Sequence, residues 1–306
     1  MKRKYGFILL FIILIISGVS AAYIKLFAQK PPQGLMVIPT NFELEVNPGK
    51  ATTRKISLYN MTNAEVDIEV KTRNFTAQGE EGNVALTGTD TPYSLANWIK
   101  ITPERIKIPS KKNYTFEFTI TPPANAEPGG HFGSIVFATV PDVKLNQTGA
   151  VVTQEIGALI LSKIPGPVNE EANLESFTTD KNFYIQGPVK FTSRVKNNSS
   201  VHIKPVGTIE IKDSFGGRDV IPVEGQNILP GVYRKIYADW KSNFMIGKYT
   251  ANASLFYGAS NKTLTANVAF WAFPVKEAAI ALAVLIILFL LRKRLLKAFK
   301  VVIIGK

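Results

Sequence analysis

Two histidines are the only imidazole groups that this 306-residue chain offers for acid–base chemistry, and the chain contains no cysteine. His131 lies in PGGHFGS, three residues before Ser134, and His202 lies in SSVHIKP. A catalytic triad needs a nucleophile and an orienting carboxylate beside its histidine, but a spacing of three in a strand places His131 and Ser134 on opposite faces. His202 belongs to no catalytic motif. The lack of thiols excludes a cysteine nucleophile, a thiolate zinc site and a disulfide scaffold.

Adjacent carboxylates are the next group with chemical potential, because two of them can hydrolyse a glycosidic bond. Glu80–Glu81 and Glu170–Glu171 are such pairs, but both lie in polar segments where solvated turn residues are expected. Asp213 and Asp219 lack the spacing of a twelve-residue calcium loop and fit a hairpin turn better. No P-loop, dinucleotide fingerprint or HExxH motif occurs. We therefore expect no enzyme, no cofactor, no metal site and no small-molecule substrate.

The elements that would position these groups are strands, because short runs of alternating apolar and polar residues are bounded by Gly, Pro, Asn and Asp. The clearest runs are 53–59, 66–72, 114–121, 134–140, 189–195, 208–212, 234–239 and 249–257. The order of events in the first half returns in the second, with Asn60 matching Asn197 and Gly130 matching Gly247. This pattern predicts an all-β protein of two tandem immunoglobulin-like β-sandwiches, at 31–165 and 166–272, joined at Pro165-Gly166-Pro167.

Both ends of the chain carry targeting patterns. Residues 1–28 join three cations to an apolar run and small residues, which predicts a signal peptide or an uncleaved signal anchor that forms an N-terminal helix. Residues 273–291 predict a C-terminal transmembrane helix, and 292–306 a basic cytoplasmic tail. The residues expected to set its membrane interface and topology are Trp271, Phe273, Lys276, Arg292, Lys293 and Arg294. A buried core helix is the alternative for the apolar run.

The formal charge of +13 is concentrated in those ends. Residues 1–28 hold four of the 36 Lys and Arg and residues 276–306 hold seven, whereas the intervening segment has a net charge of only +3. A basic protein often binds nucleic acid, but here most of the excess charge belongs to export and membrane anchoring. We therefore expect no nucleic-acid partner.

The first half also resembles a known family. The resemblance covers residues 36–163, and its most specific features are the NPG at Asn47–Gly49, the Asn60 turn, Trp98-Ile99 and the run PGGHFGSIVF. These segments resemble the first domain of WxL-interacting cell-surface proteins, a chaperone-like immunoglobulin sandwich described as peptidoglycan-binding. The second half is similar only in kind. The resemblance implies a sandwich fold and a cell-wall ligand.

A long polar loop and many glycosylation sequons are further candidate surface features. The loop at 77–96 would offer Tyr93 and Leu95 as apolar anchors for a ligand. Trp98 would either plug the end of the sandwich or serve as a sugar-stacking platform. Eight Asn-x-Ser/Thr sequons are candidate glycosylation sites: Asn60, Asn74, Asn113, Asn146, Asn197, Asn198, Asn252 and Asn261.

These features favour a non-enzymatic, single-pass membrane protein with most of its chain outside the cytoplasm. Its expected role is that of an adhesion or scaffold module that binds cell-wall glycan or other surface proteins. The alternative is a membrane-tethered assembly chaperone that completes partner subunits by strand addition. That alternative predicts an unpaired apolar edge at Ile135–Ala138 or Ile156–Leu161.

Overall fold

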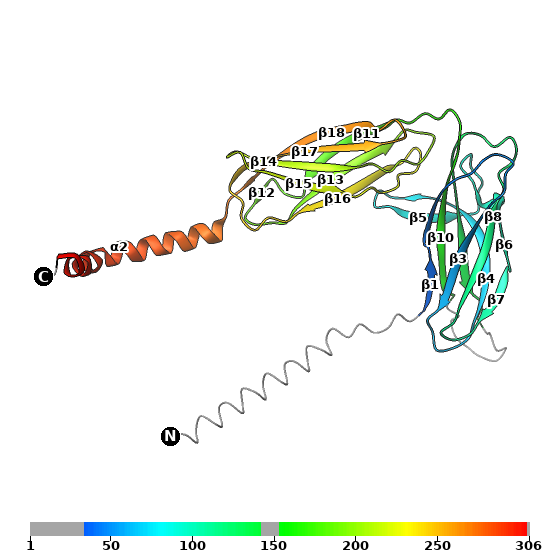
Figure 1. Cartoon of the computed structure of the whole chain (residues 1–306), viewed down its shortest axis with the longest axis horizontal. Coiled ribbons are helices and arrows are strands. Elements are labelled where there is room, and N and C mark those ends of the chain that lie inside the picture. The colour runs from blue at the N-terminus through cyan, green and yellow to red at the C-terminus, as the bar shows by residue number, and fades with distance from the viewer. Residues whose placement is uncertain (1–33, 142–152, 305–306) are drawn as a thin grey trace, which may run out of the picture.

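The computed structural model describes residues 34–141 and 153–304, with side chains up to residue 292. Over these residues the chain forms two β-sandwiches that lie at an angle to each other, followed by a helix (Figure 1). The predicted signal segment at 1–28 and the sequon at Asn146 lie outside the described residues. The all-β class and the two sandwiches are as predicted, and the boundary falls between Ile164 and Ala172.

Sandwich 1 contains β1 to β10 in two sheets. The first sheet has the order β1 (Leu35–Ile38), β3 (Thr52–Asn60), β8 (Asn113–Ile120) and β6 (Ile99–Thr102). The second has the order β2 (Asn41–Glu45), β10 (Glu155–Ile164), β9 (Gly129–Thr139), β4 (Val66–Gln78) and β5 (Asn83–Thr87), with β7 (Arg105–Ile108) also paired to β4. A short 3₁₀ helix, η1 (Ala96–Trp98), precedes β6. The alternation in β8 puts Phe116, Phe118 and Ile120 into the core between the sheets.

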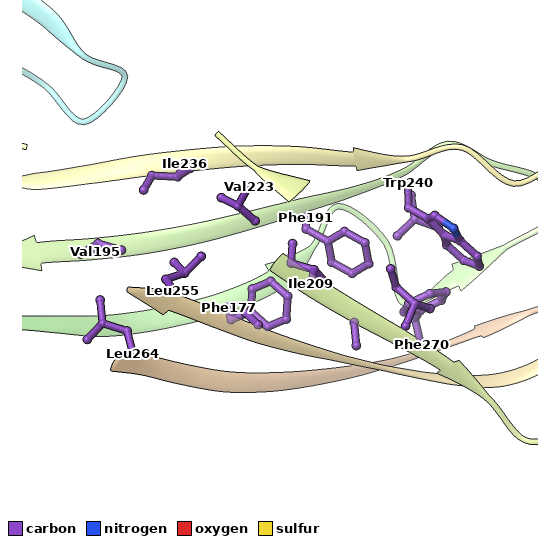
Figure 2. Close-up of a cluster of buried hydrophobic side chains, with 14 of the residues drawn as sticks. Phe177, Phe191, Val195, Ile209, Val223, Ile236, Trp240, Leu255, Leu264 and Phe270 are labelled. Carbon is purple, nitrogen blue, oxygen red and sulfur yellow. The ribbon is translucent and has the colours of Figure 1, made fainter. Parts of the chain in front are cut away.

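Sandwich 2 contains β11 to β18. One sheet has the order β11 (Ala172–Thr179), β13 (Val189–Asn197) and β16 (Tyr233–Trp240). The other has the order β12 (Phe183–Tyr184), β18 (Lys262–Ala272), β17 (Gly247–Tyr257), β14 (Val206–Asp213) and β15 (Arg218–Val223). Figure 2 shows aromatic and aliphatic side chains of both sheets filling the space between them. Tyr249 stacks on Phe270 at a centroid distance of 5.3 Å, and Phe177 stacks on Phe191 at 5.6 Å.

The eight strands expected from the sequence all occur, each within about one residue of its predicted limits on at least one side. The runs named from the sequence leave out β1, β2, β6, β7 and β12, which have two to five residues each. They also leave out the longer β11 and β18. Periodicity also understates β9, whose residues are buried on both faces rather than alternating. β9 lies in the middle of its sheet, between β10 and β4, so no free edge remains there.

The predicted repeat is borne out by two buried asparagines with matching hydrogen bonds. Asn60 ends β3, and its side-chain amide donates to the carbonyls of Ala64 at 2.8 Å and Ile108 at 3.0 Å. Asn197 ends β13 and donates to the carbonyls of Val201 at 2.8 Å and Ile228 at 2.8 Å. In each case the amide oxygen accepts a backbone N–H two residues further on.

Each of these asparagines closes the turn that follows its strand. The side chain supplies hydrogen-bond partners to backbone groups that would otherwise be buried without one. The second match, Gly130 with Gly247, is close but displaced by one residue. The residues that open β9 and β17 with a positive φ are Gly129 and Gly247.

Helix α2 (Val275–Ile304) follows the second sandwich directly. Among the described residues, no helix combines the length and the apolar character that a membrane crossing needs. The transmembrane helix predicted at 273–291 is therefore not supported. Its charge-free part, Ala278–Leu291, is short and is flanked by Lys276–Glu277 and by Arg292. The predicted tail also differs from the structure, because the helix continues through Lys293 and Arg294 to Ile304.

We predict that Asn197→Ala lowers the free energy of unfolding by about 1–3 kcal/mol, because the carbonyls of Val201 and Ile228 lose a buried donor. Asn60→Ala is expected to have a similar effect on sandwich 1. Urea denaturation followed by tryptophan fluorescence measures the change. Asn113→Ala, at an exposed position, is the control and should leave stability unchanged within about 0.5 kcal/mol. Equal stability of the Asn197 variant and the control would contradict the proposed closing role.

Candidate functional site

The groups with catalytic potential do not come together. His131 lies on the core side of β9, where its ring packs on Trp98 at 4.4 Å and its Nε2 lies 3.2 Å from the carbonyl of Glu127. Ser134 lies on the opposite face and donates to the carbonyl of Arg73 at 3.0 Å. His202 is half-buried, and desolvation lowers its pKa. Over the described residues no three His, Asp or Glu side chains form a metal-binding group.

Glu80 and Glu81 lie in a turn, as the sequence suggested, but both carboxylates also have partners in sandwich 2. The β4–β5 turn carries them onto sandwich 2, where Glu80 accepts two hydrogen bonds from Arg194 at 2.9 and 2.6 Å. Glu81 accepts from Lys235 at 3.1 Å and from the Tyr237 hydroxyl at 2.5 Å. Hydrogen bonds from Arg194 and Tyr237, respectively, are the main causes that lower the pKa of the two carboxyls. We call these five residues the hairpin clamp.

A second contact between the sandwiches is centred on Glu43 of β2. Its carboxylate accepts from Asn227 at 2.6 Å and from Lys204 at 3.1 Å. The hydrogen bond from Asn227 is the main cause that lowers the pKa of Glu43. Beside it lies a cleft of about 380 Å³ between the sandwiches, with Phe75 and Leu161 among the residues of its wall.

The sandwiches also meet through their backbones at the junction that follows β10. The N–H of Gly130 donates to the carbonyl of Ser200 at 2.9 Å. A Cβ on Gly129 would lie only 3.1 Å from that same oxygen, so the PGG motif serves the domain junction. Glu170, of the second predicted acid pair, is buried and bonds to the N–H of Ala259 at 2.8 Å and to Lys163 at 3.4 Å. Neither acid pair is arranged for glycoside hydrolysis.

The predicted ligand loop at 77–96 is buried only at its end, at Leu95 and Ala96. Leu95 is fully buried, so its role as an exposed anchor is ruled out in this structure. Trp98 is half-buried against the core of sandwich 1, which agrees with the plug and not with the sugar platform. Of the three predicted contact residues only Tyr93 is exposed, and its carbonyl accepts the N–H of Phe132 at 2.7 Å. The loop is held in place by the fold.

Several sequons are also structural. Asn60, Asn74 and Asn197 are buried, so their amides are not accessible for glycosylation. The oxygen of Asn74 accepts the N–H groups of Leu95 and Ala96 at 3.1 and 2.9 Å. The sequons at Asn113, Asn198, Asn252 and Asn261 are at least partly exposed.

The loop after Asp213 is the expected hairpin turn, in which this carboxylate accepts two backbone N–H groups at 2.8 Å each.

The candidate site lies at the outer edge of β10, which is paired over only half of its length. β9 covers one edge along the whole strand. β2 covers the other edge only from Leu159 to Lys163. In the part of the chain that the structure describes, no strand pairs with Glu155–Ala158 on that side. The predicted edge at Ile156–Leu161 is therefore correct for its first half, whereas Ile135–Ala138 is wrong because β9 is a central strand.

The backbone groups at this open edge can be assigned from their neighbours. Leu159 donates its N–H to the carbonyl of Thr40 at 3.0 Å, and the carbonyl of Lys163 accepts the N–H of Val46 at 3.0 Å. Because alternate residues of a strand direct their backbone groups toward the same edge, Glu155 and Gly157 continue this row beyond β2. Their N–H and C=O groups therefore point to the side on which no described strand lies.

An apolar groove of about 480 Å³ lies beside the open edge. Val84 and Leu86 of β5 form one wall, and Val136 of β9 with Ile156 and Leu159 of β10 contributes to the rest. Leu86 is 44% exposed, so this wall is accessible. The site thus combines unpaired backbone groups with aliphatic side chains. This is the combination that binds an extended peptide by strand addition, in which backbone hydrogen bonds give affinity and alternate side chains enter the groove.

No protein-family model and no curated protein matches the sequence, so the resemblance to WxL-interacting proteins remains a prediction. Among solved structures, the chain is similar to the class 5 fimbriae chaperone CfaA, with 16% identity, a TM-score of 0.38, and coverage of 78% of this chain and 99% of that one. It is also similar to the Pseudomonas aeruginosa CupB2 chaperone, with 9% identity, a TM-score of 0.37, and coverage of 77% and 100%. A third similar structure is the E. coli chaperone DraB, with 12% identity, a TM-score of 0.37, and coverage of 76% of this chain and 96% of that one. At these values no statement about function follows.

We predict that the two sandwiches separate at low pH. The pKa values of Glu80 and Glu81 are lowered from 4.5 in the folded chain, so their contacts are present above that pH and are lost as the pH falls through the lowered values. Because the chain has no native cysteine, dyes can be placed at Lys100→Cys and Thr265→Cys, and energy transfer between them measures the change. At acid pH we expect a lower mean transfer efficiency and a broader distribution of efficiencies among the molecules.

The double variant Glu80→Gln/Glu81→Gln should show the broadened distribution already at pH 7. Glu104→Gln, an exposed acid of sandwich 1, is the matched control and should behave like the parent chain. If the clamp variant kept the narrow distribution of the parent, the clamp would not be what holds the sandwiches together.

Proposed function

We propose that this chain is a non-enzymatic binding protein that holds an extended segment of another surface protein at the open edge of β10. This is the assembly-chaperone alternative in its general form. The observation that carries the proposal is the coincidence of the unpaired backbone at Glu155–Ala158 with the groove between β5 and β10. Binding by strand addition needs no catalytic group, in keeping with the dispersed histidines and acids.

The composition of the groove favours an apolar segment with alternating side chains. Val84, Leu86 and Leu159 offer aliphatic contacts, and Glu155 is the acid among the groove residues. Side chains of a bound strand point alternately to its two faces, so every second residue would enter the groove. An exposed edge that also carries apolar side chains is a hazard for aggregation unless a partner covers it. A partner segment that covers this edge accounts for why the chain keeps it exposed and apolar.

The adhesion or scaffold interpretation, with cell-wall glycan as ligand, has less support. Its predicted contacts included Leu95 and Trp98, which pack into sandwich 1. The exposed groove is apolar, whereas a glycan requires polar side chains beside an aromatic surface. Binding to other surface proteins is common to both interpretations, and it is the part that we retain.

We predict that Glu155→Pro weakens peptide binding at least tenfold. Proline removes the N–H that points to the open edge but leaves the hydrogen bonds of β9 intact, since edge positions of this kind tolerate proline. Glu155→Ala removes the same side chain but keeps the N–H, so it should bind like the parent. Fluorescence anisotropy of a labelled decapeptide of alternating Val and Thr, with a lysine at each end, measures the affinity.

Glu155 is a better test position than Gly157, because a Cβ at Gly157 would lie 2.6 Å from the carbonyl oxygen of Ile135 and would disturb β9 itself. Equal peptide affinity of the Pro and Ala variants would contradict strand addition. So would a failure of the parent chain to bind any of a set of such decapeptides in which Leu or Ile replaces Val.

A second prediction concerns the groove. Leu86→Glu places a carboxylate on the accessible wall of an apolar groove. A bound peptide would bury this charge, and burial without a cationic or hydrogen-bonding partner costs several kcal/mol. We expect at least a tenfold loss of affinity for the same decapeptide. Val220→Glu changes an equally exposed residue of β15, at 47% exposure compared with 44%, and should have no effect. Similar losses in both variants would indicate a general effect of charge and not a groove.

A further inference from the structure

Figure 1 shows the end of sandwich 2 from which α2 leaves. Several residues at this end have exposed apolar side chains. They come from the strand ends and turns of both sheets. Their exposed fractions range from 37% to 75%. We refer to them as the collar: Phe183, Ile185, Phe215, Phe244, Ile246, Trp271 and Phe273.

Backbone contacts show that the collar is one surface. Phe183 pairs with Trp271 in the sheet, and the N–H of Phe273 donates to the carbonyl of Tyr184 at 2.9 Å. A Cβ on Gly247 would lie 3.2 Å from the ring of Phe215, so the β14–β15 turn lies against the start of β17.

The remaining part of the collar is joined in the same way. Gly187, two residues after Ile185, is so close to Ser242 that a Cβ would lie 2.6 Å from the Ser242 carbonyl oxygen. The loop that holds Phe244 and Ile246 therefore lies beside the loop that holds Ile185. The collar residues therefore lie on neighbouring turns and strand ends.

Helix α2 extends the same apolar surface. Lys276 in its first turn donates to the side chain of Gln186 at 2.9 Å, which ties the start of the helix to the collar. Beyond it, the large apolar side chains between Ile280 and Leu291 are 38% to 72% exposed on all sides of the helix.

The charges at this end fit an anionic surface. Exposed Lys181, Lys241 and Lys248 lie next to collar residues in the sequence. Of the nearby carboxylates, Asp180 accepts the Tyr184 hydroxyl at 2.6 Å and Asp219 accepts the Trp240 indole N–H at 2.6 Å, whereas Asp239 and Glu277 are exposed. Aromatic side chains with lysines at their margin are typical of protein surfaces at the lipid headgroup level.

We propose that the collar seats sandwich 2 on a lipid bilayer surface, with the aromatic and aliphatic side chains at the boundary between headgroups and acyl chains. This inference does not depend on the strand-addition function, which uses the opposite sandwich. It adds the turn residues Phe183, Ile185, Phe215, Phe244 and Ile246 to the lipid contact expected of Trp271 and Phe273. Ordinary monomer surfaces rarely keep an apolar patch of this kind uncovered.

The test uses the full chain with single cysteines, because the protein has none of its own. An environment-sensitive fluorophore attached at Phe215→Cys or Phe244→Cys should shift its emission to the blue when vesicles of phosphatidylcholine and phosphatidylglycerol are added. Brominated lipids in the same vesicles should quench it by at least half. The same fluorophore at Val220→Cys, on the side of β15, is the matched control and should show neither change.

Loss of the Phe215 signal when Phe244→Ser and Ile246→Ser are introduced would support a shared surface. Labels at Phe215 and Phe244 that stay unquenched while α2 associates with the vesicles would overturn the proposal. A blue shift that appears without vesicles and rises with protein concentration would also overturn it, and would assign the collar to contacts between copies of the chain.

Discussion

Sandwich 1 depends on how its first extended segment, β1 and β2, is divided between the two sheets. β1 pairs with β3 in one sheet, and after Pro39 and Thr40 the chain continues as β2, which pairs with β10 in the other. One short segment thus joins both sheets and shields the core between them. The same division leaves β2 only five residues long. Since β10 has ten residues, half of its outer edge has no partner from the described chain. The open edge therefore follows from how the sandwich is closed.

The hairpin clamp and the groove are coupled because both belong to the β4–β5 hairpin. Its turn carries Glu80 and Glu81 onto sandwich 2, and its second strand supplies Val84 and Leu86 to the groove wall. Polar contacts at an accessible interface are individually weak, but several of them anchor one short hairpin at its tip. Contacts at the tip restrain the hairpin whose second strand, β5, pairs with β4 and lines the groove. Sandwich 2 thus acts as a brace for the wall of a site that lies on sandwich 1.

The sequence predicted the fold class well because strands such as β8, β13 and β17 alternate clearly along their length, although β9 does not. It also pointed to Asn60 and Asn197, since asparagine after an apolar run marks a turn, although not to their identical hydrogen bonds. The roles of Glu80 and Glu81 could not be predicted, because their partners Arg194 and Lys235 are more than a hundred residues away in the sequence. The open half of β10 could not be predicted either, because it also depends on a segment far away in the sequence. Its pairing depends on where β2 begins, because the parallel pairing starts with Asn41 opposite Leu159. A strand of five residues gives almost no periodic signal.

The groove and the proposed lipid surface lie far apart in the molecule. The collar is at one end of sandwich 2 and the hairpin clamp is near the other (Figure 1). β17 spans that sandwich with eleven residues, and at about 3.3 Å per residue it is roughly 35 Å long. A chain seated by its collar would therefore hold the groove several tens of ångströms from the headgroups. Salt screens charges over about 8 Å at physiological ionic strength, so the lipid charge would have little influence on a segment approaching the groove. With only +3 between the charged ends of the chain, recognition there must depend on backbone pairing and on the fit of aliphatic side chains.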